Sequence, residues 1–318
     1  NLMNIQPERS RWLQMAEQEL EIMEKHHIQA CGIEDSNYPR LLKHCEDAPL
    51  VLFYKGTLED SDTKNIAIVG TRKATEVGKK RVDTLLQELA QMGYRPNIIS
   101  GLAYGIDIAA HTACVHYGLK AQAVLGHGLH MIYPASHKNM AEKILDQGGT
   151  LISEFPTCAQ VLPTNFLQRN RIVAGMSEAI LVAESPIKGG AMSTARQALS
   201  YSREVMAIPG RPEDTTFAGC NLLIKQNIAT LVENVKDLLR ILNWSPLPTG
   251  PYQMSLDLFP ESDDETRLIE TLTKAGEQNI DQLHQLTRIP VHDLSVLLLK
   301  LELEGHVMQL PGNCYTLI

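Results

Sequence analysis

The amino-acid sequence predicts an α/β fold: an extended, Rossmann-like, doubly wound and mostly parallel sheet with a small C-terminal winged-helix-like domain. Two observations carry this prediction. Between residues 60 and 241, short apolar segments are separated by about 20–30 residues, and most of them end at or beside a glycine. Beyond a proline-rich stretch, residues 263–318 show three helical apolar patterns and a terminal hairpin.

Length and composition set the limits of this prediction. The chain has 318 residues, of which 44% are hydrophobic and 21% charged, which is typical of two globular domains or of one domain with an appendage. Its net charge of −8 means that any anion site has to be a local patch. The six cysteines form no CxxC pair, so we expect neither a zinc site nor disulfides, and a cytoplasmic location. No segment approaches the roughly 18–20 apolar residues of a membrane span.

Residues 1–35 are predicted to form an N-terminal helical segment. Apolar and charged residues are interleaved over 11–30, which favours a helix there. The N-terminus has no basic-then-apolar signal pattern. Because the chain starts with Asn-Leu-Met, we interpret this segment as the remnant of a longer upstream domain.

Residues 36–242 are predicted to form the main domain. After an apolar strand at 50–54, six further strands are expected, because their apolar runs lack the alternation of a half-exposed strand and are spaced by helix-length segments. In a parallel sheet of this kind, the ligand binds at the carboxyl ends of the strands. The six runs are "NIAIVG", "NIISG", "AQAVLG", "GTLIS", "EAILVAE" and "EVMAIPG".

The C-terminal part divides into a linker and a small domain. Residues 243–262 hold four prolines and no helical period, and therefore predict a linker. Within 263–318, Leu294, Leu297, Leu298 and Leu301 form an i, i+3, i+4, i+7 stripe, which indicates the third of three helices. The closing segment "HVMQLPGNCYTLI" completes a winged-helix pattern.

Glycines and arginines gather where the predicted strands end. "VGTR" (69–72), "SGLAYGID" (100–107) and "KGGAMSTARQA" (188–198) each follow a strand, and "FLQRNRIVAG" (166–175) precedes one. Glycine lets backbone N–H groups approach an anion, and helix N-termini add partial positive charge. Arginine supplies a fork that fits phosphate oxygens. Together, these segments predict a phosphate-binding cradle.

Asp107 and His111 share a helix face and raise the possibility of a catalytic pair. The sequence contains no GxSxG elbow, no HExxH and no P-loop. We therefore interpret Asp107 as a first-turn carboxylate and His111 as a packed histidine. The histidines form no ligand set, and no metal site is assigned.

An enzymatic alternative comes from Rossmann-like nucleotide N-glycosidases, which carry PGGxGTxxE in the corresponding loop. Here the loop reads "KGGAMSTARQA", with one extra residue before Thr194 and Gln197 in place of the glutamate. A neutral amide cannot act as a general acid or base. A second alternative is a nucleotide-sensing module that signals through the winged helix.

The motifs occur together in an order and spacing that resemble the DNA processing protein A family (DprA, also called Smf). They are "VGTR", "SGLAYGIDIAAH", "GHGLHMIYP", "SEFP", "FLQRNRIVAG", "GGAMSTARQA", "AIPG" and "GCNLLI", and the resemblance covers roughly residues 36–230. It implies a non-enzymatic recombination mediator that binds single-stranded DNA and protects incoming DNA. It also implies that the protein forms a homodimer and loads a RecA-type recombinase during natural transformation.

The resemblance also implies which residues bind DNA. Arg72 would grip a phosphate, Ser100 and Gly101 would line the pocket, and Phe166 would stack near a base. Arg169 and Arg171 would hold the pocket's charge or its walls. The same pocket would include Asn170, Lys188, Gly189, Gly190 and Thr194, with no catalytic residue, cofactor or metal. The sequence departs from the family pattern in two places: Leu167 replaces a usual proline, and Gly189 replaces a usual serine.

The predicted winged-helix domain is acidic. Residues 261–318 contain four basic and ten acidic residues, a net charge of −6 out of the chain's −8. Such a surface repels a polyanion. We therefore expect this domain to contact proteins or regulate the chain, or to be a simple solvated cap.

Overall fold

The computed structural model describes residues 6–58, 64–244, 263–303, 306–310 and 314–317. The chain divides into two compact units, Asn1–Thr249 and Gly250–Ile318, which are described separately below. Most of the linker predicted at 243–262 lies outside the described residues.

The first unit alternates strands and helices as the spacing of the apolar runs predicts. Its strands are β1 (Gln29–Gly32), β2 (Val51–Gly56), β3 (Asn65–Gly70), β4 (Asn97–Ser100), β5 (Lys120–Leu125), β6 (Thr150–Ser153), β7 (Ala179–Glu184), β8 (Glu204–Ala207) and β9 (Thr230–Leu231). Its helices are α1 (Gln6–Lys25), α2 (Arg40–Lys43), α3 (Glu76–Gln91), α4 (Ile106–Tyr117), η2 (Ala135–His137), α5 (Lys138–Asp146), α6 (Pro163–Gly175), α7 (Gly190–Ser200), α8 (Ala218–Lys225) and α9 (Val235–Ile241).

The strands form one nine-stranded sheet in the order β1-β2-β6-β5-β4-β3-β7-β8-β9. From β6 to β9 all neighbours pair parallel, whereas β1 with β2 and β2 with β6 pair antiparallel. Every residue of β4, β6 and β7 is buried, because helices cover both faces of the sheet. The predicted mixed α/β fold with a mostly parallel sheet is confirmed.

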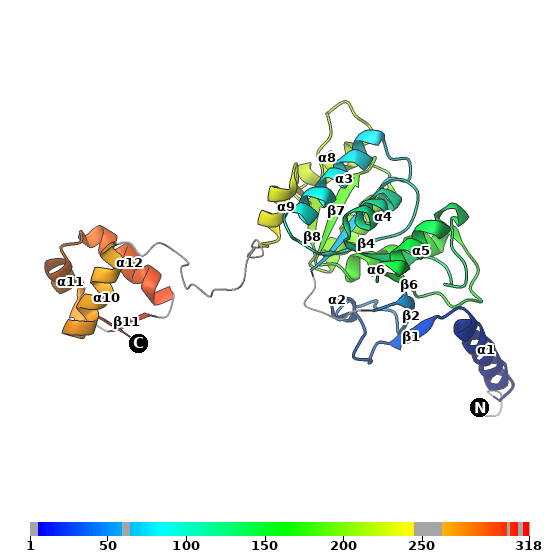
Figure 1. Cartoon of the computed structure of the whole chain (residues 1–318), viewed down its shortest axis with the longest axis horizontal. Coiled ribbons are helices and arrows are strands. Elements are labelled where there is room, and N and C mark those ends of the chain that lie inside the picture. The colour runs from blue at the N-terminus through cyan, green and yellow to red at the C-terminus, as the bar shows by residue number, and fades with distance from the viewer. Residues whose placement is uncertain (1–5, 59–63, 245–262, 304–305, 311–313, 318) are drawn as a thin grey trace. The chain divides into compact units, whose positions relative to one another are not determined.

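The order in which the chain adds strands to the sheet reverses between β3 and β7, although these two strands are parallel. From β3 the chain continues to β4, β5 and β6 on one side, and from β7 it continues to β8 and β9 on the other. Right-handed crossovers place the helices that follow these two strands on opposite faces. In agreement, α3 packs against α4 (Figure 1), and α6 packs against α7. The crevice at this reversal is where doubly wound sheets bind ligands.

The N-terminal helix differs from the range expected over residues 11–30. It runs over Gln6–Lys25, and after His27, whose φ is 54°, the chain enters β1. The strand forms because Gln29–Gly32 pairs with Val51–Tyr54 of β2, a partner that lies some distance along the chain. Local periodicity does not report such a pairing, which is why the sequence predicts a helix through this strand.

The second unit has the predicted winged-helix pattern. Helices α10 (Asp263–Ala275), α11 (Ile280–Thr287) and α12 (Val291–Leu303) surround one apolar core, and β10 (Gln278–Asn279), β11 (Val307–Leu310) and β12 (Cys314–Leu317) pair in the order β10-β12-β11. In the predicted leucine stripe of α12, Leu294, Leu298 and Leu301 are buried and Leu297 is partly buried.

Two separate cores predict two unfolding events. Leu298 is 1% exposed within the core of the second unit, whereas its neighbour Leu299 is 58% exposed. We expect Leu298→Ala to lower the free energy of unfolding of the second unit by about 2–5 kcal/mol, because it leaves a cavity. Leu299→Ala should change it by no more than about 0.5 kcal/mol. Differential scanning calorimetry checks both. An equal shift of the first unit's transition would contradict the separation of the cores.

Candidate nucleic-acid interface

A pocket of about 350 Å³ opens at the carboxyl ends of β3 and β7, where the strand order reverses. Its walls come from the loops that follow β3, β4 and β7 and from one face of α6. The lining residues are Val69, Gly70, Thr71, Arg72, Gly101, Ala103, Asp107, Pro163, Phe166, Leu167, Arg169, Asn170, Val173, Gly189, Gly190, Ala191 and Thr194. The structure thus brings together eight of the eleven residues predicted for a phosphate cradle.

The loops after β3 and β4 are joined through backbone hydrogen bonds. Thr71 N donates to Glu184 O at the end of β7 (2.7 Å), and Ile106 N donates to Thr71 O (3.2 Å). Gly105 has φ +79°, and a Cβ atom there would lie 2.1 Å from Thr71 O. A glycine is therefore required at position 105 for this close approach. The loop that carries Arg72 is held in place by the two neighbouring strand ends.

The floor of the pocket holds a buried cation. Arg169 is 3% exposed, and its Nη1 donates to Val124 O at 2.7 Å. Its guanidinium lies against Gly101, where a Cβ atom would be 1.8 Å from Nη1. Burial lowers the pKa of Arg169, and the nearby Asp107 carboxylate opposes this shift. Arg169 thus contributes a fixed positive charge to the pocket floor, with the Asp107 carboxyl group nearby.

Asp107 and His111 do not have the properties of a catalytic pair. Burial raises the pKa of Asp107, while the charge of Arg169 and the backbone amide of Ala103 act in the opposite direction. Burial, together with the charge of Arg169, lowers the pKa of His111 to about 3. Near neutral pH this imidazole is uncharged and too weak a base for general base catalysis.

The N-terminus of α7, which follows β7, forms one wall of the pocket. Gly189 is the N-cap of this 11-residue helix, and Gly190 and Thr194 also line the pocket. Backbone N–H groups at a helix N-terminus attract anions. A Cβ atom at position 189 would lie 2.3 Å from Ser185 Oγ. A side chain at position 189 would therefore require the Ser185 hydroxyl to move.

Arg72 and Phe166 form the exposed rim. Arg72 is exposed, and its Cζ lies 5.5 Å from the centroid of the Phe166 ring. A guanidinium over a ring is a favourable cation–π contact that also holds the charge in place. Phe166 is half-buried, so part of its ring remains available to a ligand.

Helix α6 presents different residues on its two faces. Pro163, Phe166, Leu167, Asn170 and Val173 follow a helical period and line the pocket. Arg171 lies two positions after Arg169, which is more than half a turn around the helix. The predicted placement of Arg171 in the pocket is therefore corrected: its side chain points to the other side of α6.

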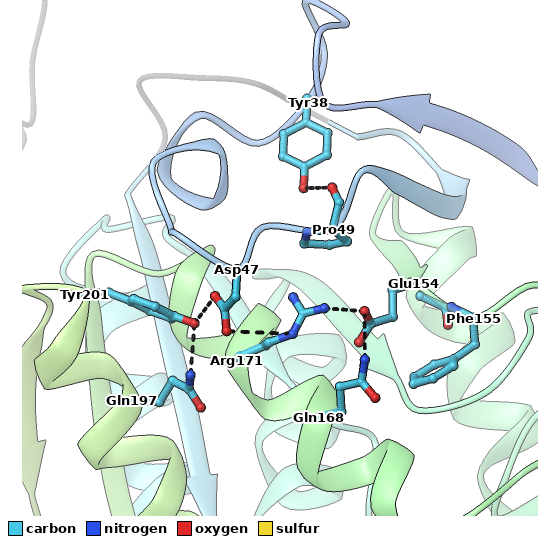
Figure 2. A network of polar contacts seen from close by, with 10 residues as sticks. Tyr38, Asp47, Pro49, Glu154, Phe155, Gln168, Arg171, Gln197 and Tyr201 are labelled. Atoms are coloured by element: carbon cyan, nitrogen blue, oxygen red, sulfur yellow. Dashed lines mark hydrogen bonds and ion pairs between the residues drawn. The ribbon is translucent and has the colours of Figure 1, made fainter.

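A polar network holds Arg171 there (Figure 2). Arg171 Nη2 donates to Glu154 Oε2, and its Nε lies 3.9 Å from Asp47 Oδ2. Asp47 accepts a hydrogen bond from Tyr201 Oη, which in turn accepts one from Gln197 Nε2 at 3.0 Å. The network ties the loop after α2 to α6, α7 and the end of β6. It is a structural element outside the pocket.

Two further predicted residues lie beside the pocket. Ser100 is buried at the end of β4, and its hydroxyl donates to Ile68 O at 2.6 Å. It joins two strands and does not line the pocket. Lys188 is exposed in the turn before α7 and lies outside the lining.

Several lining residues were not among the individual binding residues predicted from the sequence. Pro163, Leu167 and Val173 could have been found by assigning α6 as a helix and continuing the face of Phe166 at intervals of three and four. Ala103 and Ala191 lie within the predicted cradle segments, but nothing in their residue type singles them out, because small apolar residues occur throughout the chain.

The described part of the chain contains no cluster of three or more His, Cys, Asp or Glu side chains placed to hold a metal ion. Among the helices described, none is long and apolar enough to cross a membrane.

Comparison with known proteins identifies the family. A model described as "DNA recombination-mediator protein A" matches residues 29–243. The chain belongs to this family. A second model, described as "DprA winged helix domain", matches residues 254–313, which covers most of the acidic C-terminal unit.

Relatives in the DprA family match most of the chain. Protein Smf of Escherichia coli is 36% identical over 292 residues, which cover 91% of this chain and 76% of the relative. DNA processing protein DprA of Streptococcus pneumoniae is 38% identical over 208 residues, 65% of this chain and 72% of the relative. The chain is thus a DNA-processing recombination mediator of this family.

Two solved DprA structures share the fold. The structure from Streptococcus pneumoniae has a TM-score of 0.63 at 37% identity and covers 67% of this chain and 74% of that one. The structure from Helicobacter pylori has a TM-score of 0.60 at 29% identity and covers 69% of this chain and 97% of that one. The latter was described for its single-stranded DNA binding mode.

The winged-helix unit presents few cations. Helix α12 contains a single lysine, Lys300, whose Nζ is bound to both carboxylate oxygens of Glu265 at 3.0 and 2.9 Å. Arg288 forms the C-cap of α11 with φ 60°. Val296 and Leu299 are exposed on α12. This helix therefore presents apolar side chains where a DNA-reading helix carries basic ones.

The position of Arg171 predicts a structural role. Its side chain is 13% exposed and that of Glu154 is 9% exposed. We expect Arg171→Ala to lower the free energy of unfolding of the first unit by about 3 kcal/mol, because it leaves a mostly buried carboxylate without its partner. Denaturant unfolding measures this effect. Arg72→Ala, at an exposed position, is the matched control and should stay within about 0.5 kcal/mol of the parent. Equal stabilities of the parent and Arg171→Ala would contradict the structural role.

Proposed function

We propose that the pocket binds single-stranded DNA and that the protein acts through it as a recombination mediator. The observation that carries the proposal is that one pocket, at the point where the strand order reverses, contains Arg72, Arg169 and the N-terminus of α7. The DprA of Helicobacter pylori, which shares this fold, is described as binding single-stranded DNA.

The dimensions of the pocket favour a single strand over a duplex. A volume of about 350 Å³ is that of a small-molecule site and accommodates a unit of phosphate and base. A base can reach Phe166 only when it is not paired within a duplex. The backbone amides and arginines of the pocket recognise phosphate, which carries no sequence information. Binding should therefore depend little on base sequence.

We further propose that the protein acts as a homodimer, protects incoming DNA and loads a RecA-type recombinase in natural transformation. The family's description as a recombination mediator supports this proposal, because a mediator hands single-stranded DNA to a recombinase. The apolar exposed face of α12 offers a surface for a protein partner, within a segment (residues 261–318) whose net charge is −6.

A non-enzymatic role is part of the proposal. Gln197, at the position where related nucleotide N-glycosidases carry a glutamate, donates to Tyr201 Oη and lies outside the pocket lining. The buried, neutral His111 offers no strong base in its place. The remaining alternative, a nucleotide-sensing module, predicts saturable binding of mononucleotides with no gain in affinity for longer oligonucleotides.

The central experiment compares the affinities of the parent and Arg72→Ala for single-stranded and duplex DNA at several salt concentrations. We expect the parent to prefer the single strand and to bind longer oligonucleotides more tightly. Arg72→Ala should weaken binding uniformly across sequences. It should also reduce the slope of log K against log salt by roughly 0.7 for each phosphate that the variant no longer neutralises. Fluorescence anisotropy measures these quantities.

Arg95→Ala is the matched control, because Arg95 precedes β4 and so lies at the amino ends of the parallel strands, whereas the pocket lies at their carboxyl ends. Its affinity should equal that of the parent. Duplex binding as tight as single-strand binding in the same buffer would count against the proposal, as would an unchanged salt slope in Arg72→Ala. Release of free base from a nucleoside monophosphate would contradict the non-enzymatic role.

Deletion of residues 263–318 should leave single-strand affinity nearly unchanged. The deleted segment contains all four basic residues and nine of the ten acidic residues found from position 261 onward, so it offers phosphate no net attraction. At low salt, where repulsion extends further, the affinity should stay constant or rise slightly.

Titration of the truncated protein, with its fold checked by circular dichroism, tests this prediction. A tenfold loss of affinity, about 1.4 kcal/mol, in a folded truncated protein would show that the winged helix contributes to DNA binding.

A further inference from the structure

An aromatic residue outside the pocket lining continues the row formed by Arg72 and Phe166. The Tyr133 ring, in the loop after β5, has its centroid 5.7 Å from that of Phe166, and the two ring planes are inclined by 47°. Phe166 therefore contacts both the Arg72 guanidinium and the Tyr133 ring. The row begins at the pocket rim and continues to the loop after β5.

The loop holds Tyr133 in a defined position. Tyr133 N donates to Nε2 of the buried His127 at 3.1 Å, and His127 Nδ1 lies 3.0 Å from Gly128 O. Because Nε2 accepts a hydrogen bond, the imidazole proton belongs on Nδ1, where it is donated to Gly128 O. Burial lowers the pKa of His127, which favours this neutral form. Ser153 Oγ donates to His127 O at 2.8 Å and joins the loop to β6.

Tyr133 keeps much of its ring in solvent. It is 51% exposed although it contacts Phe166. Tyr104, on the loop after β4, is equally exposed at 52%. Its hydroxyl, however, is hydrogen-bonded to Ser136 at 3.0 Å, and its ring packs edge-on against His137. The Tyr133 ring is thus the better platform for an incoming flat group, because its loop is fixed through the backbone.

We propose that Tyr133 forms a second base-stacking position, so that a single strand held at Arg72 places one base against Phe166 and the next against Tyr133. This inference rests on the proposed single-stranded DNA binding of the pocket. Stacking on an aromatic face accepts every base, so the position extends the site along the strand without adding sequence preference. The ligand class is single-stranded nucleic acid of at least two successive nucleotides.

The test compares Tyr133→Ala, Tyr133→Phe and the control Tyr117→Ala with the parent. Tyr117 ends α4 near the amino end of β5, away from the carboxyl ends that hold the pocket, and its hydroxyl is bound to Asp83. We expect Tyr133→Ala to lose about tenfold in affinity for an oligothymidylate, since base–aromatic stacking has a comparable effect when removed. The phenylalanine variant and Tyr117→Ala should bind like the parent. Thermal unfolding confirms that all four proteins are folded.

The fluorescence of a base analogue distinguishes base stacking on Tyr133 from a purely structural role of this residue. An oligonucleotide with one 2-aminopurine should be quenched on binding to the parent and to Tyr133→Phe, and less so on binding to Tyr133→Ala. Unchanged affinity and quenching in Tyr133→Ala would overturn the inference. Arg72→Ala, measured in parallel, distinguishes failure of the second stacking position from failure of the proposed DNA-binding pocket. If it weakens binding while Tyr133→Ala does not, the second stacking position alone fails, and if neither has an effect, the pocket assignment fails.

Discussion

The guanidinium of Arg169 lies buried between the ends of β4 and β5, where it donates to Val124 O and faces Asp107. A cation removed from water is tolerated only with hydrogen bonds and a counter-charge, and this requirement constrains its neighbours. Position 101 has to be glycine, because a Cβ atom would meet Nη1. Helix α4 has to place Asp107 in its first turn, and α6 has to direct Arg169 inward. Both helices and the loop after β4 are fixed by this one group.

Helix α6 contributes both to the pocket and to a polar network outside it. One face carries Phe166, Asn170 and Arg169 toward the pocket, and the other carries Gln168 and Arg171 into the network with Glu154. The network joins α6 to the segment that precedes β2 and, through Asp47 and Tyr201, to α7 (Figure 2). The two helices that line the pocket, α6 and α7, are therefore joined by contacts that lie outside the pocket.

Much of the fold follows from the sequence because parallel strands buried on both faces appear as apolar runs, and glycines mark their carboxyl ends. The same pattern placed Gly101, Gly189 and Arg72 in one crevice. It did not separate Arg169 from Arg171, because that requires the phase of α6, which the arginine-rich stretch alone does not give. The contact of Tyr133 with Phe166 joins residues more than thirty positions apart, and no local pattern reports it. The strand Gln29–Gly32 was missed for a similar reason, since its partner β2 determines its conformation.

The hydrogen bond from Tyr133 N to His127 holds the loop after β5 in one conformation, which affects the kinetics of the proposed binding. A loop that is already ordered loses little conformational freedom on binding, so little of the interaction energy is consumed in arranging it. In the proposed complex, encounter with a single strand then requires no slow rearrangement of this rim, and association proceeds at a rate set by diffusion and charge. Differences in affinity among strands should accordingly arise from how long each complex persists.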